Sequence, residues 1–148
     1  MIEVDVSELT ELRKILDRIP ATVEGVNARN RALLRASRIL EQRLFQLTPV
    51  GPSRVQKKYD GILADAVRAK KTAYLKPMQS QVIVGFSKSK NKAGWRAHFT
   101  EYGFTHYKSG KFIQGQKFME RAERETALEV ESRFEAELQK EIDKMFGE

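Results

Sequence analysis

The residues best suited to chemistry are the two histidines of the chain, His98 and His106, with Glu101 between them. Imidazole and carboxylate groups at short spacing are the groups that bind zinc or move protons. The pattern His-x-x-Glu-x-x-x-x-His matches no standard zinc motif. The aromatic-rich stretch around it favours strand and loop over the helix that a His-Glu-x-x-His site requires. We therefore expect no metal site.

Other catalytic patterns are missing from the sequence. There is no Gly-x-Ser-x-Gly elbow, no phosphate-binding glycine motif and no cysteine. The acids of the central region are Asp60, Asp65 and Glu101, and nothing in the sequence places two of them together. The sequence thus predicts neither an enzyme nor a cofactor. No apolar run is long enough for a membrane span, and the acidic MIEVDVSEL start does not resemble a secretory signal, so we expect synthesis in the cytoplasm.

Charge is segregated along the 148 residues. Residues 51–117 hold 14 basic and 3 acidic residues, whereas residues 118–148 hold 5 basic and 10 acidic ones. A basic middle and an acidic end suit a polyanionic partner, and they equally suit head-to-tail packing between identical copies. Lysines interleaved with aromatic residues keep nucleic-acid binding open as an alternative function, although no recognised nucleic-acid motif is present.

The elements that must position these residues begin with helices. A short strand at Ile2 is followed by a helix that ends at Pro20, and a second helix is predicted from the cap Thr22 to Leu47. Apolar residues of this second helix recur about every 3.5 residues, with Asn30 and Ser37 at two of the positions. That pattern indicates a core helix with polar interruptions, or a seam against another helix.

The central region reads as sheet and basic loops. We predict strands at 71–77 and 81–86, paired antiparallel, and a mobile lysine-rich loop over 87–94. Residues 61–67 are either a helical turn or the lead-in to a strand. Residues 95–102 look like strand, and residues 104–116 look like a loop.

Everything from Phe118 onward is predicted to be helix. Its apolar positions recur every four residues, so the stripe drifts by about 40° per step around the helix. A straight helix on one sheet cannot bury all of such a stripe. We expect the far end, with Phe134, Leu138 and Ile142, to meet a second subunit. An amphipathic helix of this kind also suggests another function, that of a chaperone or regulator which offers the helix to another protein.

Four segments of the sequence occur in an order that is typical of a known family. A long helix runs into Thr48-Pro49, a Gly-Ile-Leu segment begins at Gly61, WRAHFTEYG spans 95–103, and GQKFMERA opens the last helix at 115–122. The chain resembles, over residues 25–140, the small tail-completion or head–tail joining (neck) proteins of long-tailed bacteriophages and prophages. It departs from that family's usual residues at Asp60, Phe104 and Lys117.

The resemblance implies a structural virion protein without catalytic residues. Such a protein would form a homo-oligomeric ring at the virion neck, between a tail terminator or tail-tube protein and head connector or stopper proteins, with DNA passing through the lumen. The candidate interface residues are Lys88, Lys90, Lys92, Trp95, Arg96, Glu101, Gly103, Phe134, Leu138 and Ile142. Among them Trp95 is expected to anchor the core first, as are Phe99 and Phe118, and Glu101 is expected to pair with a cation such as Arg96.

The expected fold is a single α+β domain over residues 1–148. A strand and helices fill 1–47, the sheet and basic loops fill 48–117, and the C-terminal helix fills 118–148. A small, mainly antiparallel sheet should pack against the long helix of the N-terminal half and the long C-terminal helix.

Overall fold

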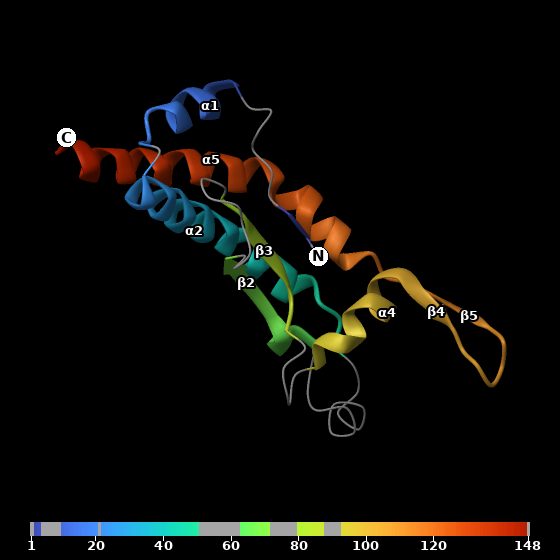
Figure 1. Ribbon diagram of the computed structural model, residues 1–148. Helices are drawn as coiled ribbons and strands as arrows, with labels where there is room; N and C mark the ends of the chain where they lie inside the picture. The colour runs from blue at the N-terminus through green and yellow to red at the C-terminus, as the bar shows by residue number, and fades with distance from the viewer. Residues whose placement is uncertain are drawn as a thin grey trace.

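The computed structural model describes residues 2–3, 10–20, 22–50, 63–71, 80–87 and 93–147. It confirms the α+β class: the long helices α2 and α5 pack side by side, and a small antiparallel sheet packs against α2 (Figure 1). The elements are β1 (Ile2–Glu3), α1 (Thr10–Asp17), α2 (Val23–Leu47), β2 (Val67–Lys71), β3 (Val82–Phe86), α4 (Ala97–Tyr102), β4 (Gly103–Thr105), β5 (Phe112–Gln114) and α5 (Phe118–Phe146), with 3₁₀ turns at Leu63–Ala66 and Ala93–Arg96.

The main sheet has the strand order β1-β3-β2, and both pairs are antiparallel. Its central strand β3 confirms the strand predicted at 81–86. The partner strand begins earlier than predicted, at Val67 rather than Lys71, so the antiparallel pairing is confirmed but the bounds are not. The described part of the segment 61–67 combines both alternatives, since a 3₁₀ turn at Leu63–Ala66 leads directly into β2 at Val67. Residues 61 and 62 lie outside the described part of the chain. Residues 72–79 lie outside the described part of the chain.

Local signals set the ends of α2. The hydroxyl oxygen of Thr22 accepts a hydrogen bond from the Gly25 N–H at 3.1 Å, which is the cap predicted from the sequence. At the other end the Thr48 N–H donates to the Leu44 carbonyl at 3.0 Å, and Pro49 then prevents further helix.

Two adjacent stripes of α2 are buried. One stripe consists of small residues, and the other consists of leucines with Ser37 among them. Ser37 is buried, and its hydroxyl donates a hydrogen bond to the Leu33 carbonyl at 2.7 Å. This confirms the interpretation of α2 as a core helix with polar interruptions. The first stripe contains Gly25, Ala28, Ala32 and Ala36, and the second contains Leu33, Ser37, Leu40 and Leu44. Both stripes are covered because α2 contacts α5 as well as the sheet. The seam does not reach Val23, whose side chain is 80% exposed.

The stripe on α5 is buried within a single chain. All of its positions from Phe118 to Ile142 are covered, and only Phe146 is exposed. At its start the Phe118 ring meets Phe86 of β3, with ring centroids 5.7 Å apart. Further along, α5 packs on α2, and α1 lies over its C-terminal half (Figure 1). The second surface that the drifting stripe requires therefore comes from the same chain.

The segment after β3 differs from the prediction. Residues 97–102, expected as strand, form the short helix α4, and residues 103–114, expected as loop, contain the β4–β5 hairpin. Phe104 stands opposite Ile113 in this hairpin, which joins α4 to α5.

Candidate functional site

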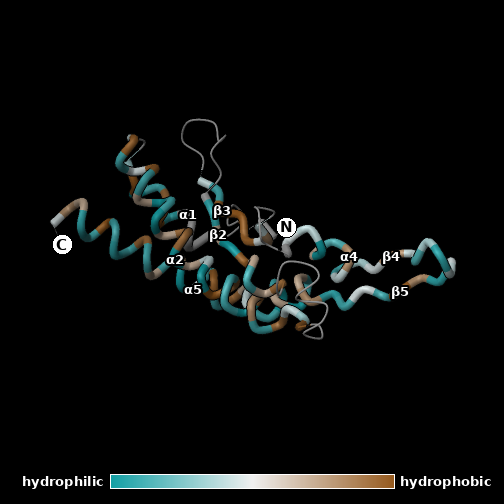
Figure 2. The backbone as a smooth tube through the Cα atoms, turned by 90° about the horizontal axis from the view of Figure 1, so that it is seen from below, coloured by the Kyte–Doolittle hydropathy of each residue, from teal (hydrophilic) through white to brown (hydrophobic). Residues whose placement is uncertain are grey.

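The β4–β5 hairpin projects from the body of the molecule in both views (Figure 1 and Figure 2). With Trp95 and α4 it forms what we call the aromatic arm, residues 95–115. Large apolar side chains of this arm are exposed, with exposed fractions of 85% for Tyr107 and 64% for Phe112. The others are Trp95, Phe99, Tyr102, Phe104 and Ile113. Gathered exposed apolar side chains are characteristic of interaction surfaces.

Several rings of the arm are held against one another. The rings of Phe99 and Phe104 meet edge to face with centroids 5.7 Å apart, and this contact ties α4 to β4. The His98 and Tyr102 ring centroids lie 5.1 Å apart. The Lys117 ammonium lies 4.7 Å from the centre of the Tyr102 ring, within the range of a cation–π interaction. These contacts between rings hold the exposed aromatic side chains of the arm in fixed positions relative to one another.

Glu101 fixes the arm to the start of α5. Its side chain is buried, and its two carboxylate oxygens accept hydrogen bonds from the backbone N–H groups of Met119 at 2.8 Å and Glu120 at 3.1 Å. These N–H groups belong to the first turn of α5, where a negative charge is stabilised. Lys117, at the N-cap position, makes no side-chain cap. Glu101 therefore caps a helix and does not pair with Arg96 as expected.

Two glycines complete the base of the arm. Gly103 ends α4 with φ of +85°, a backbone conformation that glycine adopts without strain. A Cβ atom on Gly115 would collide with the backbone of Glu101 and Tyr102. The returning chain can thus pass directly against the end of α4.

The hairpin is basic as well as aromatic. Residues 103–117 contain Lys108, Lys111 and Lys117 and no acidic residue. At the turn, Nδ1 of His106 accepts a hydrogen bond from the Ser109 N–H at 3.3 Å and lies 3.1 Å from the Ser109 hydroxyl oxygen. This exposed histidine–serine contact shapes the turn, and no carboxylate of the described residues orients the imidazole as catalysis would require.

The other predicted site residues fall into two groups. Phe134, Leu138 and Ile142 are at most 2% exposed inside the chain, so they are core residues and their assignment to a contact between subunits was wrong. Trp95 and Phe99 are about half exposed, so they are not the core anchors expected, whereas Phe118 is one. Lys88, Lys90 and Lys92 lie outside the described residues, as does most of the loop predicted to be mobile.

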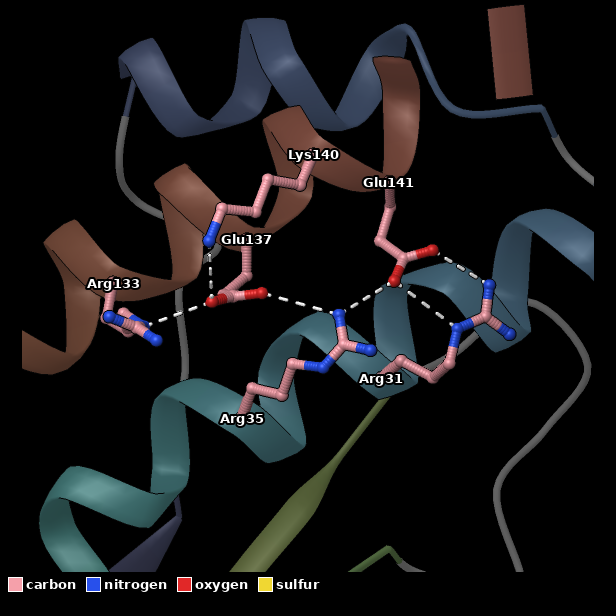
Figure 3. A network of polar contacts seen from close by, with 6 residues as sticks. All are labelled: Arg31, Arg35, Arg133, Glu137, Lys140 and Glu141. Atoms are coloured by element: carbon pink, nitrogen blue, oxygen red, sulfur yellow. Dashed lines mark hydrogen bonds and ion pairs between the residues drawn. The ribbon is translucent and has the colours of Figure 1, made fainter. Parts of the chain in front are cut away.

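The principal cluster of charges between helices is an ion-pair network between α2 and α5 (Figure 3). The buried Glu141 carboxylate accepts from Arg31 at 2.8 Å and from Arg35 at 3.0 Å. Glu137, also buried, is bound by Arg35 at 3.3 Å and by Arg133 at 3.1 Å. Within the described residues no group of three or more His, Cys, Asp or Glu side chains could hold a metal ion. The network joins the two long helices and offers no free carboxylate pair for acid–base chemistry.

The Glu141 network predicts a pH-dependent stability. The hydrogen bond from Arg31 lowers the pKa of Glu141 below its ordinary 4.5, and burial opposes this only in part. A lowered folded-state pKa stabilises the fold above about pH 4.5, and this contribution is lost as the pH falls through the folded value. Glu141→Gln should therefore lower the free energy of unfolding by about 1–3 kcal/mol at neutral pH and by much less near pH 3.

Urea unfolding of the native chain and of Glu141→Gln at both pH values measures this difference. Glu135→Gln is the matched control, because Glu135 lies on the same helix, is exposed, and makes no ion pair with a described residue. An equal loss for Glu141→Gln at both pH values would show that its charge does not contribute.

Sequence reasoning missed three exposed apolar residues of the arm, namely Phe104, Phe112 and Ile113. The available signal was the turn sequence around Gly110, whose φ is +68°, flanked by Phe104-Thr105 and Phe112-Ile113. A glycine of this kind between two short apolar segments is typical of a hairpin with a longer loop.

Comparisons of the chain with protein families, with curated proteins and with solved structures found no match. Among the described residues, no helix is both long and apolar enough to cross a membrane.

Proposed function

We propose that this chain is a structural virion protein that oligomerises as a ring at the head–tail interface of a tailed phage, in tail completion or head–tail joining. The observation that carries the proposal is the aromatic arm, which exposes apolar side chains on a base held by Glu101. Six partly exposed aromatic side chains present on the order of 700 Å² of ring surface. Each partner of a standard protein interface buries about 800 Å².

The proposed role needs no catalytic group. The polar clusters described above have structural partners: Glu101 caps α5, the Glu137 and Glu141 carboxylates bind arginines, and His106 shapes a turn. The resemblance in the order of the sequence motifs supports a place in the neck. The proposed neighbours are a tail terminator or tail-tube protein on one side and head connector or stopper proteins on the other, with DNA in the lumen.

The proposal predicts self-association through the arm. Light scattering over a concentration series, with negative-stain images of the heaviest fraction, should show closed rings for the native chain. The double variant Phe112→Ser/Ile113→Ser should remain folded but shift toward monomer, since it removes exposed apolar side chains and no core contact.

Phe45→Ser is the matched control for this experiment. Phe45 is a 50% exposed aromatic residue on α2, outside the arm, so its replacement should leave the rings unchanged. A native chain that stays monomeric at all concentrations would contradict self-association. Rings that form normally from Phe112→Ser/Ile113→Ser would contradict the role of the arm.

A basic nucleic-acid-binding accessory protein is the second candidate. It is favoured by the tip of the hairpin, where Tyr107 is 85% exposed and the Lys108 ammonium lies 5.8 Å from its ring centre. Rings and cations in this arrangement can stack on bases and neutralise phosphates. Fluorescence anisotropy with duplex DNA discriminates the two functions, because binding to DNA gives an affinity that falls steeply with salt. A ring protein without this activity gives no such binding.

A further inference from the structure

The solvent-facing side of α5 carries four carboxylates that have no ion-pair partner among the described residues. Positions spaced by three and four residues place Glu120, Glu131 and Glu135 on the same side as the exposed Leu128, and Glu123 lies at the edge of this side. The cations Arg121 and Arg124 lie among them. None of these four carboxylates makes an ion pair with a residue that the structure describes. We call this surface the acidic face.

The opposite flank of α5 differs in this respect. There Glu125 binds Arg43 and Arg121, and Glu137 and Glu141 bind arginines of α2. Carboxylates next to α2 thus have cationic partners, whereas those of the acidic face have none among the residues that the structure describes. Like charges spaced four residues apart, such as Glu131 and Glu135, destabilise a helix slightly. A basic partner would reverse that effect.

The hairpin has the complementary composition. It offers Lys108 and Lys111 without any acid, next to exposed rings that suit the apolar Leu128, which is 82% exposed. The net formal charges are +2 for residues 103–114 and −2 for the four carboxylates of the acidic face with Arg121 and Arg124. Opposite potentials of this kind orient two surfaces and fix their register.

The two surfaces do not meet within one chain. The hairpin extends away from the body, beyond the N-terminal end of α5 (Figure 1), and the two hydrogen bonds of Glu101 hold its base there. The acidic face begins in the first turn of α5 with Glu120, and the part used here, Leu128, Glu131 and Glu135, lies farther along the helix. A contact between them therefore joins two different copies and uses a different surface on each, which is the head-to-tail geometry that generates rings.

We propose that the aromatic, basic hairpin of one copy docks on the acidic face of α5 of the next copy. This inference rests on the proposed self-assembling function and assigns the two surfaces that meet. Lys108 and Lys111 face carboxylates such as Glu131 and Glu135, and rings of the arm cover Leu128. The contact weakens with rising salt, since its charges lie at the surface.

Charge reversal tests the contact. Lys108→Glu/Lys111→Glu, here the arm variant, and Glu131→Lys/Glu135→Lys, here the helix variant, each place like charges in every interface. Each should raise the apparent dissociation constant about a hundredfold or more. All four side chains lie at the surface or partly exposed, so both variants should keep the circular dichroism spectrum of the native chain. Glu129→Lys, an exposed change on α5 outside the acidic face, is the control and should assemble normally.

An equimolar mixture of the two variants gives the decisive result. The arm of the first variant, now acidic, is complementary in charge to the helix surface of the second variant, now basic. The native basic arm of the second variant is likewise complementary to the native acidic face of the first. The mixture should reassemble with the two chains alternating, which native mass spectrometry of isotope-labelled chains detects.

Each outcome decides the question. Loss of assembly in both variants and recovery in the mixture support the contact. If the variants assemble like the native chain, or if the mixture fails to recover, the arm-to-helix contact is wrong while the ring proposal stands. A native chain that never assembles overturns both.

Discussion

Replacement of Phe134 by alanine is expected to lower the free energy of unfolding of the chain by about 3–5 kcal/mol. The ring is 2% exposed and belongs to the buried cluster that joins α2, β3 and α5. Its removal takes apolar surface out of the core and leaves a cavity that the two long helices can fill only in part. Typical domains are stable by about 5–15 kcal/mol, so this loss is a large share of the total.

Denaturant unfolding at a concentration where the chain is monomeric measures this effect without a contribution from assembly. Leu128→Ala is the matched control on the same helix, because Leu128 is 82% exposed, and it should change stability by no more than about 0.5 kcal/mol. If Phe134→Ala left the monomer as stable as the native chain but weakened association, Phe134 would face a second copy after all, against the packing described here.

Replacement of Glu101 by alanine should lower the free energy of unfolding by about 2–4 kcal/mol. The substitution removes two charge-assisted hydrogen bonds to the first turn of α5 and leaves the Met119 N–H buried without an acceptor. It also releases the base of the aromatic arm from α5. Hydrogen exchange of the α4 and hairpin amides should therefore accelerate more than exchange in the middle of α2.

Glu101→Gln separates shape from charge. The carboxamide has one acceptor oxygen, and its amino group would face the second N–H donor, so we expect at most a partial recovery of stability. Glu123→Ala serves as the control, since Glu123 is an exposed carboxylate near the start of α5, the helix that Glu101 caps, and makes no ion pair with a described residue. A loss below about 0.5 kcal/mol for Glu101→Ala would show that the cap contributes nothing measurable.

The long elements of this fold could be predicted from the chain alone. Thr22, Pro49 and the four-residue apolar repeat from Phe118 act on their immediate neighbours, and the helix bounds follow from them. The alternation that marks β3 is equally local. The α+β class follows from these elements because each must bury one face against another.

Only the tertiary structure shows which surface covers the drifting apolar stripe on α5. The repeat shows that one flat surface is insufficient, but it does not say whether the additional surface belongs to this chain or to another. The small residues of α2, Gly25 and Ala28 among them, allow a second buried face that a count of large apolar residues does not detect. Both α2 and α1 contact α5, and Leu138 and Ile142 are fully buried within the one chain.

The candidate site shows the same division. Charge segregation, the absence of catalytic motifs, and the aromatic and basic composition of residues 95–117 are properties of the sequence itself. Whether Trp95 and Phe99 lie inside or outside is not, since an aromatic ring is equally compatible with a core and with an interface until the surrounding chain is placed. Glu101 accepts a hydrogen bond from the Met119 N–H, 18 residues later in the chain and in the first turn of α5. Only the folded chain brings this N–H group to the carboxylate.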